Sequence, residues 1–189
     1  MAKKYLIEGG YPLKGKIKPN GNKNAALPII AATLLTDEEV ILRNIPDIED
    51  VAVMLTILKE IGSTVERLDT NSYKIKTNIS KTTINQELGK KIRTSILFAG
   101  PLLARSGKVE LPPPGGDVIG RRRLDTHFLA LSELGSRIEI GANFKLSANR
   151  LVGKEIFLDE ASVTGTENAI MASVLAEGET VIINAASEP

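Results

Sequence analysis

A short stretch that combines prolines, glycines, one carboxylate and three arginines is the first candidate for chemistry in this sequence. Residues 112–116 are three prolines and two glycines, Asp117 follows them, and the arginines at 121–123 close the stretch. Proline fixes the backbone angle φ and glycine frees it, so the pattern predicts a loop with a stiff entry and a mobile tip near Asp117. The loop could close over an anionic molecule, although an ordinary surface turn with a solvated basic flank explains it equally well.

Two further clusters place cations at predicted helix starts. Lys23 and Asn24 follow a loop that leads directly into a helix, and Arg93 lies in a basic run over residues 90–95. Backbone N–H groups and the helix dipole attract anions at such a start. Lysine and arginine suit phosphate and carboxylate groups, so a small polyanion bound between the three clusters would use all of them. At each cluster, a solvated basic turn is the alternative.

Asp117 does not fit such a site as a binding group, because a carboxylate repels anions. Apolar and anionic surroundings would raise its pKa and keep it protonated. We therefore interpret Asp117 as a proton donor.

The hydrophobic periodicity predicts alternating helices and strands that would position these clusters. The expected strands cover residues 4–8, 14–18, 39–43, 64–68, 72–76, 108–111, 137–140, 144–147, 155–159 and 180–183. The expected helices cover residues 22–35, 47–61, 91–105, 124–134 and 166–176, with Pro28 in a first turn that starts near Ala26 and Gly62 as a C-cap.

The order of these elements recurs with a period of about 70 residues. Residues 60–66 match residues 133–139, and residues 167–169 echo residues 23–25. Units of this kind bury their apolar faces against one another in a shared core. The third unit stops at Pro189, where its second helix would begin, so we expect a fragment; a naturally short chain that a partner chain completes is the alternative.

Composition excludes several classes of site. The 189 residues include no cysteine and one histidine, which excludes disulfides, thiolate metal sites and histidine clusters. The formal net charge of +1 gives no general attraction to nucleic acid or to a membrane surface. No apolar run of about 18 residues is present, so we expect a cytoplasmic protein.

The motifs together resemble the UDP-N-acetylglucosamine 1-carboxyvinyltransferase (UDP-GlcNAc enolpyruvyl transferase) family. The resemblance rests on residues 21–28, on residues 92–95 with 100–102, on the loop at 111–122, and on Ser162 and Val163. It extends from residue 7 to residue 186.

The resemblance implies a fold and a reaction. The fold is an inside-out α/β barrel of two domains with three similar units each. This chain would hold about two and a half units of one domain, in residues 22–189, while residues 1–21 would belong with a second domain. The family transfers the enolpyruvyl group of phosphoenolpyruvate to the 3′-hydroxyl of UDP-N-acetylglucosamine and releases phosphate, the first committed step of peptidoglycan synthesis. It uses no metal or organic cofactor, and a complementing C-terminal domain is the expected partner.

The resemblance also implies roles for individual residues. Lys23 and Asn24 would contact phosphoenolpyruvate, with Lys23 catalytic, and Arg93 and Arg122 would hold anionic groups. The UDP-sugar would be lined by Arg122, Arg123, Leu124, Asp125, Thr126, Ser162 and Val163.

Asp117 stands where many members of the family have the cysteine that protonates C3 of phosphoenolpyruvate and that the antibiotic fosfomycin alkylates. Aspartate is a natural alternative there, so we expect a fosfomycin-insensitive protein. Glu160 and Thr164 depart from the family pattern near the uridine site.

Two other functions are left open. The related 3-phosphoshikimate 1-carboxyvinyltransferases share the fold and the chemistry, but the motif at 22–27 and the loop with Asp117 argue against them. A non-catalytic half-enzyme that binds UDP-sugar is the second alternative.

Overall fold

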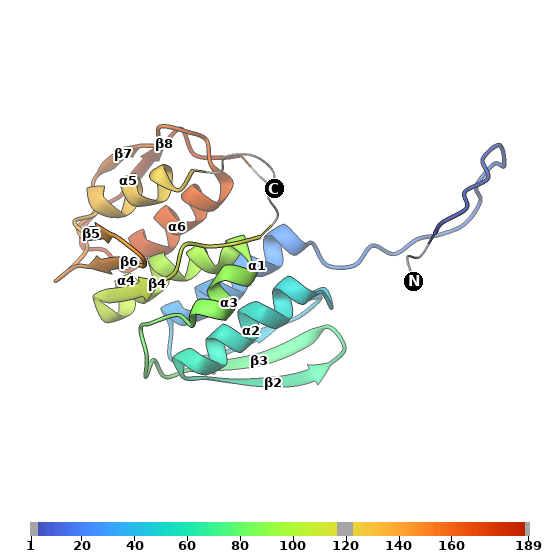
Figure 1. Cartoon of the computed structure of the whole chain (residues 1–189), viewed down its shortest axis with the longest axis horizontal. Coiled ribbons are helices and arrows are strands. Elements are labelled where there is room, and N and C mark those ends of the chain that lie inside the picture. The colour runs from blue at the N-terminus through green and yellow to red at the C-terminus, as the bar shows by residue number, and fades with distance from the viewer. Residues whose placement is uncertain (1–3, 117–122, 188–189) are drawn as a thin grey trace.

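Helices lie inside this fold and sheets lie on its outside (Figure 1). The computed structural model describes residues 4–116 and 123–187. Three units follow one another, and each contributes one helix to a central layer formed by α1, α4 and α6.

The first unit comprises α1 (Lys23–Ala32), the 3₁₀ helix η1 (Thr33–Leu35), β1 (Glu39–Leu42), α2 (Glu49–Ile61), β2 (Ser63–Asp69) and β3 (Ser72–Thr77). The second comprises α3 (Gln86–Lys91), the 3₁₀ helix η2 (Arg93–Phe98), α4 (Ala99–Ser106), β4 (Lys108–Leu111), α5 (Asp125–Glu133), β5 (Arg137–Ile140) and β6 (Phe144–Ser147). The third comprises β7 (Glu155–Phe157), α6 (Val163–Ser173) and β8 (Val181–Ile183).

The sheets confirm the internal repeat. The first two are antiparallel with the equivalent strand orders β1-β3-β2 and β4-β6-β5, so each hairpin returns to pair with the earlier strand of its unit. In the third unit β7 pairs in parallel with β8. The start of the second unit has a trace of the same parallel arrangement, because Thr83 forms an isolated bridge with Glu110 of β4.

Two asparagines mark equivalent positions and correct one detail of the predicted repeat. Asn44 follows β1 and Asn184 follows β8, and both have left-handed φ angles, 58° and 61°. The helix caps Asn22 and Ser162 keep the same spacing to these positions. Residues 23–25 are therefore equivalent to residues 163–165, and the predicted match with 167–169 was wrong by about one helical turn. Residues one turn apart lie on nearly the same face of a helix.

One continuous core joins the units. Its large, fully buried side chains come from the central helices, from η2 and from α2, and include Leu27, Ile30, Met54, Ile57, Phe98 and Leu102. Small residues such as Ala31, Ala99, Ala169 and Ala172 are also completely buried, which lets the helices approach one another closely.

The two strands expected at residues 4–8 and 14–18 are not formed. Residues 4–22 have no regular secondary structure and extend away from the rest of the chain (Figure 1). Their apolar side chains are largely exposed, with Leu6 at 90% and Leu13 at 97%. A strand depends on a paired neighbour and a covered face, and in the described chain this segment has neither.

The helix expected at residues 91–105 is divided. Ile92 has extended backbone angles, φ −132° and ψ 144°, between α3 and η2. The buried Ser95 hydroxyl contacts the carbonyls of Gly89 at 2.7 Å and Ile92 at 3.0 Å, which holds this break. Side-chain bonds of this kind compete with regular helix geometry.

Two other helix starts differ from the expectation, because polar caps fix them. Asn22 caps α1, so Pro28 lies inside the helix and leaves the Asn24 carbonyl without its helical donor. Ser162 caps α6, which begins at Val163 rather than at residue 166.

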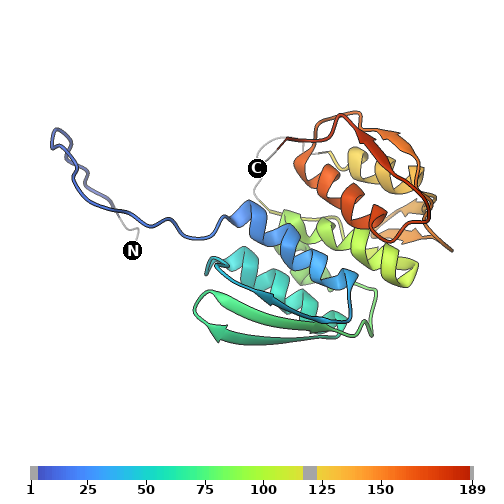
Figure 2. The ribbon, with the colours of Figure 1, turned by 180° about the vertical axis from the view of Figure 1, so that it is seen from behind.

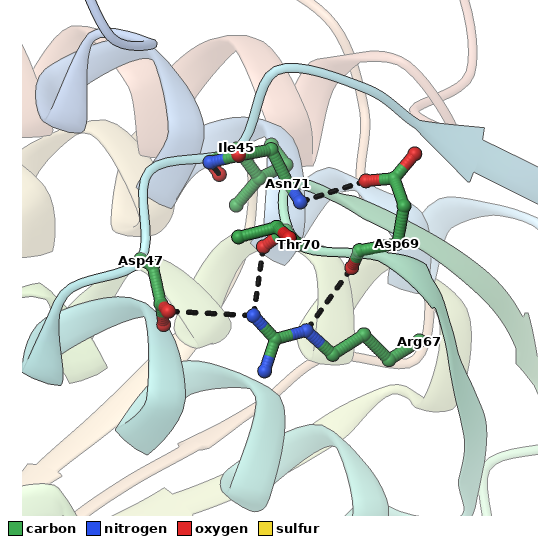
Figure 3. Close-up of polar contacts among 6 residues, drawn as sticks. All are labelled: Ile45, Asp47, Arg67, Asp69, Thr70 and Asn71. Atoms are coloured by element: carbon green, nitrogen blue, oxygen red, sulfur yellow. Dashed lines mark hydrogen bonds and ion pairs between the residues drawn. The ribbon is translucent and has the colours of Figure 1, made fainter.

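The β2–β3 turn is fastened to the loop before α2 (Figure 3). Arg67 donates to the carbonyls of Asp69 at 3.0 Å and Thr70 at 2.8 Å, and to the Asp47 carboxylate at 3.3 Å. The Asn71 amide donates to the Ile45 carbonyl at 2.8 Å, and the Ile45 N–H donates to the Asn71 carbonyl at 2.8 Å. These bonds fix the loop that carries Asn44 and leads into α2.

Replacing Asn71 should therefore weaken the fold measurably. We expect Asn71→Ala to lower the free energy of unfolding by about 1 kcal/mol, because the Ile45 carbonyl loses its side-chain donor. Urea denaturation checks this value. Thr70→Ala is the matched control in the same turn, because Thr70 takes part through its carbonyl, which the variant keeps. Equal losses in the two variants would contradict the assigned role of the Asn71 amide.

Candidate active site

The starts of several helices gather on one side of the molecule. The first turns of α1, α5 and α6 face the side on which the chain before Lys23 leaves the body (Figure 2). The predicted site residues that the structure describes lie at these starts or at the start of η2: Lys23, Asn24, Arg93, Arg123, Leu124, Asp125, Thr126, Ser162 and Val163. Asp117 and Arg122 lie outside the described residues.

The start of α1 is built from a cap, an ion pair and a close backbone approach. The Asn22 side chain accepts the Asn24 N–H at 2.8 Å, and Lys23 Nζ lies 2.7 Å from Asp50 Oδ2 of α2. A Cβ added to Gly21 would lie 1.7 Å from the carbonyl oxygen of Asn44, so only glycine fits there. The loop that the β2–β3 turn fastens therefore touches Gly21, the residue just before the α1 cap Asn22.

The entry of the proline-glycine loop packs over the break between α3 and η2. A Cβ on Gly115 would lie 1.6 Å from the Lys90 carbonyl oxygen. Gly116 has a φ of +91°, and a Cβ there would lie 3.2 Å from the Arg93 backbone nitrogen. The described part of the loop thus ends in contact with Arg93. This close packing agrees with the stiff loop entry that the prolines predict.

A chain of polar contacts connects η2, α5 and the segment before α6. Arg93 Nη2 donates to the Arg123 carbonyl at 2.9 Å, and Arg123 Nε donates to the Asp125 carboxylate. The hydrogen bond with Asp125 raises the pKa of Arg123 above its ordinary value, so this guanidinium keeps its charge. Thr126 Oγ1 donates to Asp159 Oδ1 at 2.7 Å.

Behind these exposed groups lies a buried network that the sequence did not single out. His127 of α5 is 1% exposed, and its Nε2 lies 3.1 Å from the Thr164 hydroxyl. Its Nδ1 lies 2.9 Å from Nδ2 of Asn168, which is completely buried in α6. Asn168 also donates to the Ile96 carbonyl at 2.9 Å and accepts the Gly100 N–H at 2.8 Å.

The network assigns the tautomer of His127. An amide nitrogen can only donate, so His127 Nδ1 must accept from Asn168 and the ring proton must lie on Nε2. Nε2–H then donates to the Thr164 hydroxyl. His127 is therefore neutral in this arrangement. In the sequence, only its being the single histidine of the chain could have drawn attention to this network.

One buried group and one half-buried group have shifted pKa values. Burial, with a smaller contribution from the charge of Arg93, lowers the pKa of His127 from 6.5 to about 4. Burial raises the pKa of Glu167, half-buried on α6, from 4.5 to about 7. Both shifts favour the neutral form, since desolvation penalises charge of either sign.

The two shifts should have opposite effects on stability in the same pH window. His127 binds protons more tightly when unfolded, so its contribution is complete above pH 6.5 and is lost as the pH falls toward 4. Glu167 binds protons more tightly when folded, so its contribution is complete below pH 4.5 and is lost as the pH rises toward 7. Glu167→Gln removes the opposing contribution of the carboxyl group and leaves that of His127. We expect the free energy of unfolding of this variant to rise by about 2 kcal/mol between pH 5 and pH 7.

Urea titrations at the two pH values measure this rise. The wild type should show almost no change, because the two contributions nearly cancel, and the double variant Glu167→Gln/His127→Gln should also lose the rise. An equal rise in the single and double variants would show that His127 is not its source.

Comparisons with known proteins agree with the fold and the motifs. The enolpyruvyl transferase NikO from Streptomyces tendae superposes with a TM-score of 0.77 at 19% identity, over 92% of this chain and 42% of that chain. EPSP synthase from Acinetobacter baumannii gives a TM-score of 0.71 at 18% identity, over 93% and 41%. These likenesses confirm the α/β fold of the enolpyruvyl transferase type.

Relatives in sequence carry the name that the resemblance indicated. UDP-N-acetylglucosamine 1-carboxyvinyltransferase from Treponema denticola is 62% identical over 186 residues, 98% of this chain and 44% of the relative. The proteins of that name from Borreliella burgdorferi and Bradyrhizobium diazoefficiens are 58% and 52% identical, each over 98% of this chain. The chain thus spans less than half the length of these curated relatives.

A family model described as EPSP synthase (3-phosphoshikimate 1-carboxyvinyltransferase) matches residues 7–189, nearly the whole chain. The repeated units and the similar relatives agree with this match. The match shows that the chain belongs to the EPSP synthase family of carboxyvinyltransferases.

Proposed function

We propose that this chain is the N-terminal part of a UDP-N-acetylglucosamine 1-carboxyvinyltransferase. The observation that carries the proposal is the 62% identity over 98% of the chain to a protein of that name. The reaction transfers the enolpyruvyl group of phosphoenolpyruvate to the 3′-hydroxyl of UDP-N-acetylglucosamine and releases phosphate. Both substrates are intracellular metabolites, so the proposal implies a cytoplasmic enzyme of peptidoglycan synthesis, with consequences for cell shape and division.

The proposed reaction is an addition followed by an elimination. The 3′-hydroxyl oxygen forms a bond to C2 of phosphoenolpyruvate and loses its proton, while C3 gains a proton, which gives a tetrahedral intermediate. Loss of a C3 proton and of phosphate from C2 then restores the double bond. Each step needs positioned proton donors and acceptors, and no oxidation or reduction occurs.

Asp117 is the proposed donor to C3. A carboxyl group serves this purpose if its pKa lies high enough to keep it protonated until the substrates bind. The described entry of its loop supports the assignment, because Gly115 and Gly116, directly before Asp117 in the sequence, lie against the backbone of Lys90 and Arg93.

Lys23, Arg93 and Arg122 are the proposed holders of anionic groups. They would offset the repulsion among the phosphate and carboxylate groups of the two substrates. Lys23 is held at the α1 start by Asp50, and Asn24 lies beside it. An anion bound there would compete with Asp50 for the ammonium group.

The UDP-sugar is assigned to the starts of α5 and α6. Residues 122–126, with Ser162 and Val163, would line it. Arg123 supplies a cation, although Asp125 pairs with it and the charges of Asp159 and Glu160 also act on it. An incoming diphosphate would have to compete with these carboxylates, so we expect modest affinity at this subsite.

The domain assignment is also part of the proposal. Residues 1–21 would belong with a second domain, and residues 22–189 would form the first domain, with the active site between the two. The greater length of the relatives supports a complementing C-terminal domain. The exposed apolar side chains in residues 4–22, such as Leu6, Leu13 and Ile17, are what a segment that pairs elsewhere would carry.

Calorimetry on the 189-residue chain tests the binding part of the proposal. We expect UDP-N-acetylglucosamine to bind, whereas UDP-glucose, the control ligand, should bind more weakly because it lacks the acetamido group. Phosphate release with phosphoenolpyruvate, measured in a protein that also carries the complementing domain, then separates an enzyme from a binding module. Binding of shikimate 3-phosphate instead of the UDP-sugar would support the shikimate-pathway alternative and exclude our assignment.

Asp117→Asn tests the proton donor. In a protein that also carries the complementing domain, we expect turnover to fall by about a hundredfold or more, because an amide cannot deliver the proton. Calorimetric affinity for UDP-N-acetylglucosamine should stay close to that of the wild type. Asp117→Cys should retain activity and gain sensitivity to fosfomycin. Unchanged turnover in Asp117→Asn would remove this residue from the mechanism.

A further inference from the structure

The two helix starts assigned to the UDP-sugar are joined behind the surface by one buried histidine. His127 lies in the first turn of α5, directly after Thr126, and contacts Thr164 in the first turn of α6 at 3.1 Å. The same ring contacts Asn168, one turn further along α6, at 2.9 Å. We propose that His127, acting through Thr164 and Asn168, is a positioning residue that sets the spacing of the two sugar-nucleotide-binding helix starts; this inference rests on the proposed function.

The hydrogen bonds leave the ring little freedom. Nδ1 accepts from the Asn168 amide, so Nε2–H is the ring donor and the Thr164 hydroxyl is its acceptor. The ring is 1% exposed, and water cannot replace either partner if α6 moves relative to α5. Any such shift would bury an unpaired polar atom, which proteins avoid.

Asn168 connects this pair to the central helix of the second unit. Its amide donates to Ile96 and accepts from Gly100, so it cannot follow His127 without breaking other bonds. Gly100 has no room for a Cβ, which would lie 2.7 Å from the Asn168 carbonyl oxygen. The position of α6 against α4 is thus fixed, and His127 transmits that position to α5.

The first turns of the same two helices also meet in close contact. A Cβ on Gly165 would lie 3.0 Å from Thr126 Cγ2, and Thr126 Oγ1 donates to Asp159 just before α6. Ser162 Oγ accepts the Gly165 N–H at 3.2 Å, so the cap of α6 is part of this contact. A change in spacing at His127 would therefore reach Thr126 and Ser162, two of the residues assigned to the ligand.

Thr164→Val tests the inference, because it removes the acceptor of His127 Nε2–H with little change in shape. Amide hydrogen exchange at residues 126–128 and 164–166, followed by NMR, reports both helix starts. We expect exchange to quicken on the order of tenfold in both segments, and affinity for UDP-N-acetylglucosamine to fall on the order of tenfold. Thr164→Ser keeps the hydroxyl and should restore both quantities.

Thr56→Val is the matched control. The Thr56 hydroxyl donates to the Ala52 carbonyl at 2.8 Å on the exposed surface of α2, away from the site, so neither exchange nor affinity should change. Quickened exchange in α6 alone, or lost stability with unchanged affinity, would show a merely structural bond and overturn the positioning role. If the wild type fails to bind UDP-N-acetylglucosamine while the exchange pattern appears, the ligand assignment falls and the contact between the helices stands.

Discussion

The packing of this chain depends on one buried side-chain amide, that of Asn168. Its oxygen accepts from Gly100, and its nitrogen donates to Ile96 and to His127, so all its donors are used inside an apolar core. Apolar contacts tolerate small displacements, whereas hydrogen bonds require particular distances and angles. These bonds therefore fix η2, α4, α5 and α6 relative to one another. The third unit is thereby joined to the second by directional bonds as well as by buried apolar area.

Glycines make this arrangement possible and extend it to the rim of the candidate site. Gly100 lets α6 approach α4, Gly21 lets the chain before α1 lie on Asn44, and Gly115 lets the loop entry lie on Lys90. At each position a Cβ would come within 3 Å of a carbonyl oxygen. The site is thus framed by direct backbone contacts, which leave less freedom than contacts between long side chains.

The elements that could be predicted from the sequence are those specified by neighbouring residues. Helix α2 and the two hairpins follow from local periodicity and turn residues, and the repeat was visible because the same local patterns recur. The expected strand at residues 14–18 failed because pairing is not local. The helix expected at residues 91–105 failed because the Ser95 side chain bonds back to the backbone.

In the candidate site, too, only features specified by neighbouring residues could be predicted from the sequence. Lys23 and Arg93 stand out in the sequence because they adjoin predicted helix starts. Their surroundings do not, because Asp50 reaches Lys23 from another helix and the Arg123 carbonyl reaches Arg93 from 30 residues away. Asn168 looked like part of a repeat, and only the three-dimensional arrangement shows that it meets His127.

The charges at the helix starts explain why a neutral histidine belongs behind them. Cations near a helix N-terminus oppose the dipole, and carboxylates compensate: Asp50 for Lys23 and Asp125 for Arg123. In the proposed site, an anionic ligand would take the place of these carboxylates. A protonated His127 would add a positive charge near Arg93 and would lose the bond from Asn168, since both ring nitrogens would then be donors. The burial of His127 therefore keeps this ring uncharged near neutral pH, so that in the proposed site the exposed cations and their carboxylate partners would govern which anions bind.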